Sequence, residues 1–310
     1  MKALVIKSTG SWYSVEAEDG QIYKCRIKGK FRLDGIKSTN PIVVGDNVEV
    51  VLDSDSWMIN KLYERKNQII RKSVNLSKQT HIIAANIDQA ILMITLNSPV
   101  TTTGFIDRFL VSAKAYGVDV VLFFNKNDLY DTKTLIQQDK LTRIYSNIGY
   151  KCFTFSALND SMLSIKKILK NKNNLISGHS GVGKSTLINK LLSSDLIATK
   201  EVSTTHNQGQ HTTTFSELYR LDFGGTIIDT PGIKGFGLVE ININRLGNYF
   251  PEIFKYKKEC KFHNCLHKNE PNCMVKDAVE KGLINENRYF NYLSMLDSEK
   301  SIYRTKNHKH

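Results

Sequence analysis

The first 72 residues alternate between short apolar stretches and turn residues. Four stretches have the character of strands, at 4–6, 12–17, 22–27 and 48–52, and turn pairs such as Asp19-Gly20 and Gly45-Asp46 separate them. No helical spacing of apolar residues accompanies them. This pattern predicts a small β-barrel, with the OB-fold as the leading topology.

Beyond about residue 80 the pattern changes to strands that alternate with helices. Residues 87–96 and 118–124 are apolar runs rich in β-forming side chains, whereas residues 106–116 between them have helical spacing. A helix is also predicted at 131–148, and further strands at 152–155, 174–177 and 226–228. Such alternation predicts a parallel sheet whose functional loops follow the carboxyl ends of its strands.

The remaining sequence is predicted to be helical, with helices near 240–248 and 277–297 around a group of cysteines and histidines. We therefore expect a multidomain protein. Its predicted parts are an OB-like β-barrel at 1–72, an α/β domain at 73–238 and a helical domain at 239–310.

Composition adds a bias in charge to this picture. Of 310 residues, 41% are hydrophobic and 24% charged, as in soluble globular proteins. The apolar runs are too short for a signal peptide or a membrane span, so we expect no membrane partner. The cysteine usage described below favours a reduced, cytoplasmic protein, which we expect to be a monomer. The net charge of +13 favours a polyanion such as nucleic acid, although a lysine-rich proteome would give the same bias.

A basic face is predicted on the third strand of the barrel. Lys24 and Arg26 alternate with Tyr23 and Cys25, so period-two geometry puts the two sets on opposite faces. The basic face could hold phosphates while nearby rings stack on bases, or it could be an ordinary solvated surface. The other residues expected to assist are Trp12, Tyr13, Lys28, Lys30, Arg32, Arg65, Lys66, Arg71 and Lys72.

A phosphate-binding loop stands out at 178–185. The sequence fits G-x-x-x-x-G-K-[ST], with an apolar strand before it and a helix at 186–192 after it. Glycines let backbone amides turn toward phosphates, Lys184 reaches the β- and γ-phosphates, and the Ser185 hydroxyl ligates Mg²⁺. The nucleotide-binding residues of this segment are Gly178, His179, Ser180, Gly181, Val182, Gly183, Lys184, Ser185 and Thr186.

The base is predicted to be guanine. Directly after the buried strand at 120–124 the chain has the motif Asn125, Lys126, Asn127, Asp128. A carboxylate at Asp128 accepts hydrogen bonds from the guanine N1–H and 2-amino group, which adenine does not offer. Ser156 and Ala157, followed by leucine, are similar to the short loop that backs guanine in GTPases.

Two segments are predicted to contact the γ-phosphate and its Mg²⁺ ion. Asp229 to Gly232 has the sequence DTPG, in which Asp229 fits a Mg²⁺-side carboxylate and the Gly232 amide a γ-phosphate contact. The segment 209–214 is expected to be the first switch, and either Thr213 or Thr214 would close on Mg²⁺. Ile233 stands where many GTPases have the glutamine that orients water. His211 is the candidate substitute, although it could instead contact a partner.

Three of the five cysteines are clustered near the C-terminus. Cys260, Cys265 and Cys273, with His267, match the ligands of a closed tetrahedral zinc site, which would be structural. His263 is a competing nitrogen ligand, and buried free cysteines are the alternative. Because Cys25 and Cys152 stand alone, no disulfide framework is expected.

The order of these motifs is unusual, because base recognition precedes the phosphate loop. The central domain therefore looks like a circularly permuted P-loop GTPase. With the N-terminal barrel and the Cys₃His segment, it resembles the circularly permuted, small-subunit-dependent GTPases known as RsgA or YjeQ. Further echoes of that family lie at 45–48, 105–110, 209–214 and 236–238. Ile233 also fits the family, but the Lys234 segment lacks its usual arginine and acidic residue.

The resemblance implies GTP hydrolysis stimulated by the small ribosomal subunit and its rRNA, during late subunit maturation in bacteria. It also implies a structural Zn²⁺ and Mg²⁺ with GTP. Two other functions remain open at this point. One is a GTP-regulated switch acting on a non-ribosomal RNA, and the other is a P-loop ATPase, against which Asp128 argues.

Overall fold

The N-terminal strands close into a five-stranded barrel, as their alternating apolar positions predict. A computed structural model of the chain describes residues 1–27, 41–72, 80–192, 216–229 and 241–306. The order β1-β2-β3-β5-β4 closes through a β1–β4 pairing. Alternate side chains fill its core, and Tyr13 and Cys25 lie in it. The strands are β1 Lys2–Ser8, β2 Tyr13–Ala17, β3 Ile22–Ile27, β4 Asn47–Asp53 and β5 Ser56–Leu62.

The basic face of β3 forms as predicted, with corrections around it. Lys24 and Arg26 are exposed while Cys25 is buried, and the Arg26 guanidinium lies 4.1 Å from the ring centroid of the half-exposed Trp12. The ring of Tyr13, which the sequence suggests as a stacking partner near this face, is not available, because the side chains of β2 alternate and Tyr13 is 1% exposed. Lys28, Lys30 and Arg32 lie outside the described residues.

Arg65 is also unavailable to a nucleic acid. Its guanidinium donates to both carboxylate oxygens of the buried Asp46, at 2.6 and 2.7 Å. This bidentate pair fixes the turn that leads into β4, and Asp46 also accepts from the Val43 amide. The expectation that Arg65 assists in binding phosphates is therefore wrong.

Between the barrel and the central sheet lies a separate hairpin. It consists of β6 Gln68–Lys72 and β7 Thr80–Ala85. Gly45 of the barrel approaches this hairpin so closely that a Cβ would lie 2.2 Å from the Ala85 carbonyl oxygen, and its φ is +90°. Only glycine fits at this junction.

The central sheet has helices on both faces. Its order is β10-β9-β8-β11-β13-β12, with all neighbours parallel except β12 and β13. The strands are β8 Gln89–Ile94, β9 Asp119–Phe124, β10 Lys151–Thr154, β11 Asn173–Ser177, β12 Glu217–Arg220 and β13 Thr226–Asp229. The helices are α1 Thr103–Ala115, the short η2 Asn127–Leu129, α2 Thr132–Asn147, α3 Leu163–Leu169 and α4 Lys184–Leu192.

The residues of β8 explain this layering. Leu92 and Ile94 pack with α1, whereas Ile91 and Met93 pack with α3 and α4. A parallel strand covered on both faces is apolar at nearly every position, as the sequence of β8 is.

The C-terminal part is helical, but not as predicted near its end. It contains η3 Ile243–Tyr249, α5 Pro251–Lys257, α6 Met274–Glu280 and α7 Glu286–Lys306. The single helix expected at 277–297 is wrong because the chain breaks at Gly282. There φ is +69°, and the Gly282 and Leu283 amides bond back to Val279 and Ala278.

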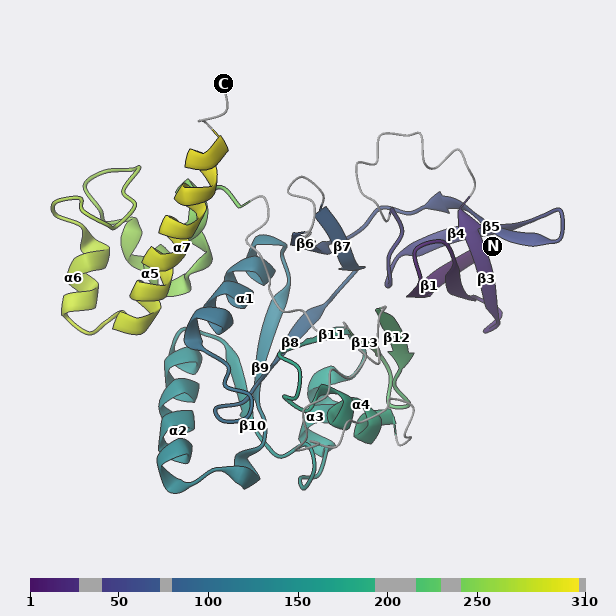
Figure 1. Cartoon of the computed structure of the whole chain (residues 1–310), viewed down its shortest axis with the longest axis horizontal. Coiled ribbons are helices and arrows are strands. Elements are labelled where there is room, and N and C mark those ends of the chain that lie inside the picture. The colour runs from purple at the N-terminus through teal and green to yellow at the C-terminus, as the bar shows by residue number, and fades with distance from the viewer. Residues whose placement is uncertain (28–40, 73–79, 193–215, 230–240, 307–310) are drawn as a thin grey trace.

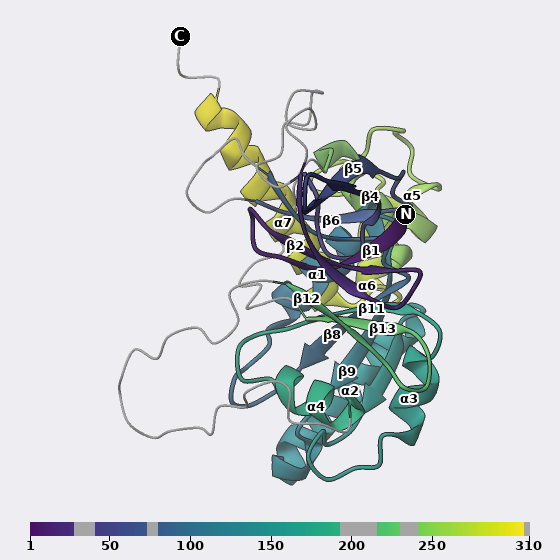
Figure 2. The same ribbon diagram turned by 90° about the vertical axis from the view of Figure 1, so that its right-hand side faces the viewer.

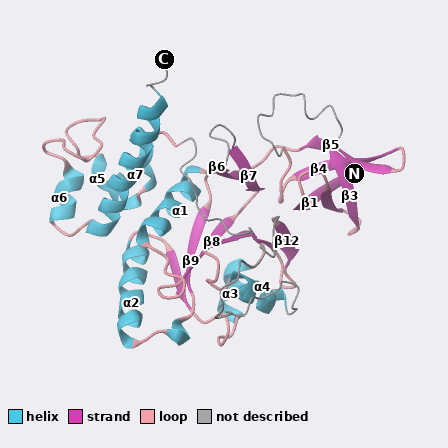
Figure 3. Cartoon of the chain, in the orientation of Figure 1, coloured by secondary structure: helices cyan, strands magenta, loops and turns pink. Residues whose placement is uncertain are grey.

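The barrel and the C-terminal helices flank the central sheet on opposite sides in Figure 1, and Figure 2 shows both at the same end of it. Figure 3 shows the contrast between the all-strand barrel and the helical C-terminal part. The sheet continues into the barrel, because β12 pairs with β1 at Lys7 and Glu217. Among the described residues, no helix is both long and apolar enough to cross a membrane.

Candidate nucleotide site and metal centre

Four of the predicted motifs meet at the carboxyl edge of the central sheet. Asn125 follows β9, Ser156 follows β10, Gly178 follows β11, and Asp229 ends β13. Because these strands are parallel, their carboxyl ends lie at the same edge. The residues read from the sequence as base-binding and phosphate-binding therefore face one site.

Asn125 is the junction of this site. Its buried side chain donates from Nδ2 to the Val182 carbonyl oxygen and accepts at Oδ1 from the Ala157 amide, both at 2.8 Å. A Cβ on Gly183 would lie 2.4 Å from Nδ2, and the φ of this glycine is +97°. Asn125 thus holds the phosphate loop and the 156–158 loop in register with the base motif.

Lys184 lies at the start of α4, inside the curve of the phosphate loop. Its Nζ donates to the carbonyl oxygens of Gly178 and His179, both at 2.8 Å. Burial lowers the pKa of Lys184, and the nearby Asp229 carboxylate opposes this shift. A cation at a helix N-terminus that follows a glycine-rich loop is suited to bind polyphosphate.

A ring contact fixes the other side of the phosphate loop. The His179 imidazole lies against the Phe105 ring, with centroids 4.1 Å apart. Burial, and then the charge of Lys184, lower the pKa of His179. Phe105 is in the first turn of α1, which Thr102 caps. The sequence marks 105–110 as a family echo, but no pattern in it indicates this contact.

The segment that the sequence predicts to bind the base forms a tight turn. Lys126 has φ +68° and donates from Nζ to the Ser98 carbonyl oxygen at 2.7 Å. Asp128 is exposed in η2, where its Oδ2 accepts from Asn159 Nδ2 at 3.0 Å. Asn159 directly follows the 156–158 loop, but no motif in the sequence indicates its contact with Asp128.

The other predicted nucleotide residues divide into two sets. Asn127 lies in η2, Ser180 lies in the phosphate loop, and Ser185 and Thr186 lie in the first turn of α4. His211, Thr213, Thr214 and Gly232 lie outside the described residues, as does Ile233.

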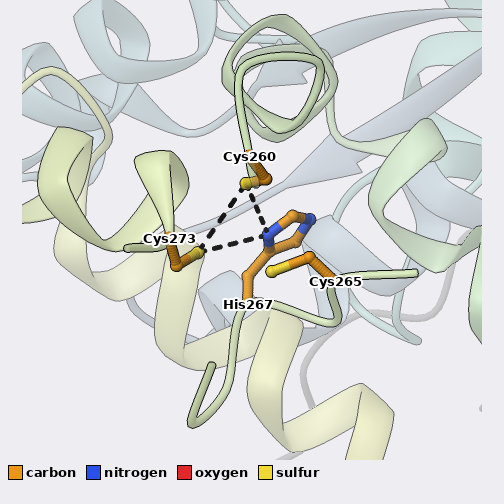
Figure 4. Close-up of side chains that lie close together, drawn as sticks. All are labelled: Cys260, Cys265, His267 and Cys273. Atoms are coloured by element: carbon orange, nitrogen blue, oxygen red, sulfur yellow. Dashed lines mark hydrogen bonds between the residues drawn. The ribbon is translucent and has the colours of Figure 1, made fainter. Parts of the chain in front are cut away.

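The four predicted metal ligands come together in the C-terminal part. Their ligand atoms all lie within 4.8 Å of one another. His267 Nδ1 lies 3.6 Å from Cys260 Sγ and 3.4 Å from Cys273 Sγ, and the two sulfurs are 4.0 Å apart (Figure 4). A tetrahedral Zn²⁺ with bonds of about 2.3 Å to sulfur and 2.0 Å to nitrogen would separate these atoms by about 3.5–3.8 Å. The ligand atoms of Cys260, His267 and Cys273 are therefore spaced as in a zinc site, and Cys265 Sγ lies within 4.8 Å of them as the fourth donor.

Local hydrogen bonds shape the loop that carries the histidine. His267 has φ +58°, and the Tyr289 hydroxyl of α7 donates to its carbonyl oxygen at 2.6 Å. The Glu270 carboxylate accepts from the Leu266 and Lys268 amides at 2.8 Å. His263, the competing nitrogen ligand, is exposed and outside the cluster.

The protonation of the cluster suits a cation. Burial, and then the charge of Lys257, lower the pKa of His267 to about 4, so at neutral pH its imidazole is neutral and able to bind metal. Burial raises the pKa of Cys265 to about 12 and raises that of Cys273. A divalent ion bound by the cysteines would stabilise their thiolates and so offset the cost of burying negative charge.

Comparison with known proteins gives a consistent result. The sequence-family model described as RsgA GTPase matches residues 62–239, and the family model of the RsgA N-terminal domain matches residues 2–57. The chain belongs to the RsgA GTPase family. It is a GTP hydrolase with the circularly permuted order of motifs.

Two curated relatives extend over nearly the whole chain. The chain is 55% identical to "Small ribosomal subunit biogenesis GTPase RsgA 2" of Bacteroides thetaiotaomicron, with 98% of this chain and 99% of that protein covered. It is 54% identical to the RsgA protein of Flavobacterium psychrophilum, with 98% and 95% covered.

Two solved structures share the fold. YjeQ from Thermotoga maritima matches with a TM-score of 0.76 at 36% identity, covering 96% of this chain and 97% of that one. YloQ, described as a circularly permuted GTPase, matches with a TM-score of 0.73 at 30% identity, covering 97% and 95%.

Proposed function

We propose that this GTPase binds the small ribosomal subunit and hydrolyses GTP to GDP and phosphate during late maturation of that subunit. Binding to the subunit stimulates the hydrolysis. The observation that carries the proposal is the site at the carboxyl edge of the sheet, where Asn125 joins the base motif to the phosphate loop. The names of the curated relatives support the choice of the small subunit as partner.

Within this function the chain's residues have separate roles. Asp128 selects guanine through two hydrogen bonds, while Lys184 and the phosphate-loop amides hold the polyphosphate. Ser185 and Asp229 would hold a Mg²⁺ ion, which neutralises charge on the phosphates when bound. Thr213 or Thr214 would complete that site from the first switch.

We further propose that His211 positions the attacking water, because Ile233 has no polar group to do so. Replacing His211 with alanine should lower subunit-stimulated turnover by about 100-fold. This is the lower end of the rate loss expected when a general acid–base side chain is removed. GTP affinity should not change. Stimulated turnover and affinity would be measured together, and unchanged stimulated turnover would contradict the role.

The barrel supplies the surface proposed for rRNA. Lys24 and Arg26 are exposed on β3, and Arg26 lies over the half-exposed Trp12 ring. Cations beside an accessible ring suit an RNA backbone with an unstacked base. The zinc domain, held by a structural Zn²⁺, would make a second contact.

We also propose that nucleotide state changes the position of the zinc domain. The second switch is expected just after Gly232, and η3 begins at Ile243, so a change in that switch could move the zinc domain on the ribosome. We expect the protein to act as a cytoplasmic monomer.

The primary experiment compares GTP turnover alone, with purified small subunits and with large subunits, with Lys184→Ala as the blank. Small subunits should raise turnover strongly and large subunits little, because the proposed partner is the small subunit. The blank should remain near background, since Lys184 is the cation proposed to bind the phosphates.

Turnover that no subunit changes would contradict the proposal and favour a GTP-regulated switch on another RNA. Binding to naked RNA fragments that is as tight as binding to whole subunits would favour that switch as well.

A further inference from the structure

The carboxylate assigned to guanine recognition is itself held by a side chain. Asn159 Nδ2 donates to Asp128 Oδ2 at 3.0 Å, although the two residues lie in different loops. Asp128 follows β9 and Asn159 follows β10, so the contact crosses between neighbouring strands. Nothing in the NKxD motif predicts such a partner.

Asn159 is exposed, but several hydrogen bonds fix the loop that carries it. The Asn159 amide donates to Ser156 Oγ at 3.1 Å. The Ser156 amide donates to the Asp160 carboxylate at 2.8 Å, and the Asp160 amide donates back to the Ser156 carbonyl oxygen at 3.0 Å. This closed turn limits where the Asn159 side chain can point.

A tie to the phosphate-binding helix adds a second constraint. Lys190 of α4 donates from Nζ to the carbonyl oxygens of Leu158 and Asp160, at 2.8 and 2.9 Å. The Ala157 amide is bonded to Asn125, as described above. Asn159 therefore extends from a loop tied both to the base motif and to the helix behind the phosphate loop.

The contact leaves room for the base. An ionised carboxylate has two oxygens with about four acceptor positions, of which guanine uses two. The torsion that turns a carboxylate about its Cβ–Cγ bond has broad minima, so an unsupported carboxylate rotates easily. A donor at Oδ2 restricts this rotation and keeps both oxygens available to the base edge.

We propose that Asn159 is a positioning residue for guanine specificity, which holds the Asp128 carboxylate in the plane that reads N1–H and the 2-amino group. This inference rests on the proposed role of Asp128. Asn159 acts through that carboxylate and increases the preference for guanine over bases that form fewer bonds with it.

The test compares the affinities of GDP and IDP, whose hypoxanthine base keeps N1–H but lacks the 2-amino group. In Asn159→Ala the GDP affinity should fall by about 3- to 10-fold, the range for the net contribution of one ordinary hydrogen bond, because the contact is exposed to solvent. IDP should lose less, because it makes one bond to Asp128 instead of two. The GDP-to-IDP ratio should therefore fall, while kcat at saturating GTP stays within about twofold.

Two variants make the result specific. Asn159→Asp keeps the shape and the backbone bond to Ser156 but places a like charge beside Asp128, so it should reduce GDP affinity more than the alanine variant. Asn147→Ala replaces an exposed asparagine at the end of α2 and should change neither affinity. Equal losses for GDP and IDP, or no loss, in Asn159→Ala would overturn the inference.

The same titrations separate this inference from the proposed function. Wild-type protein that binds GDP no better than IDP or ADP would overturn both, because Asp128 would then not read guanine. A strong wild-type preference for GDP that Asn159→Ala leaves unchanged would overturn only the role of Asn159.

Discussion

Replacing Arg288 with methionine should lower the free energy of unfolding by about 3–5 kcal/mol, because it leaves two buried carboxylates without their cation. Arg288 of α7 donates to Glu252 of α5 at 2.7 and 3.0 Å and also to Asp107 of α1. Its side chain is 4% exposed, and that of Asp107 is fully buried. The measurement is denaturant unfolding of the full chain, compared with wild type.

The Asp107 carboxylate also accepts from the Tyr145 hydroxyl at 2.8 Å and from Asn291 Nδ2 at 2.6 Å. The network therefore connects the central domain with the C-terminal helices, and its loss should affect both. Arg143→Met is the matched control, since this exposed arginine pairs with Asp139 across one turn of α2 and its loss should cost less than about 1 kcal/mol. Equal costs for the two variants would contradict a structural role for the buried network.

Replacing Cys273 with serine should reduce bound zinc from about one per chain to well below one, and the C-terminal part should lose its fixed structure. Three thiolates and one imidazole close a structural site, whose apparent binding free energy is about 10–16 kcal/mol in zinc-finger peptides. Cys273 Sγ lies 3.4 Å from His267 Nδ1, so its loss opens one face of the cluster. Metal analysis and proteolysis of protein purified without chelators would measure both effects.

Cys152→Ser is the control for the effect of replacing any cysteine with serine. Its half-buried sulfur donates to the Tyr150 carbonyl oxygen and lies outside the Cys₃His cluster, so zinc content should not change. Wild-type protein that carries far less than one zinc per chain would show that the cluster is not a resident zinc site.

The sequence predicts the nucleotide motifs better than their connections. The phosphate loop and Asn125 are recognisable because their chemistry requires fixed residue types at fixed spacing. The hydrogen bonds that align them, from Asn125 to Val182 and from Asn159 to Asp128, join distant segments. Such pairs depend on the order of strands in the sheet, and short-range patterns do not contain that order.

The secondary structure shows the same contrast between local patterns, which are predictable, and long-range contacts, which are not. Strand β9 and helix α2 were predicted within a residue or two, because their apolar periodicity is strong. Strand β5 was missed, since of its seven residues only Ile59 is fully buried and its pairing with β3 is non-local. Residue type and position in the sequence suggest Tyr13 as a ring near the basic face and Arg65 as a linker cation for rRNA, whereas packing and an ion pair determine where their side chains lie.

The pairing of β12 with β1 has a consequence for attempts to divide the protein. Through the Lys7–Glu217 pairing and the Arg220–Glu16 ion pair, the barrel contacts what would otherwise be the outer edge of the central sheet. A fragment that begins after the barrel would present the backbone groups of β12 to solvent, and exposed strand edges promote aggregation. The barrel thus acts as an edge cap for the GTPase domain, and a soluble fragment would need a charged or proline substitution on β12 to replace it.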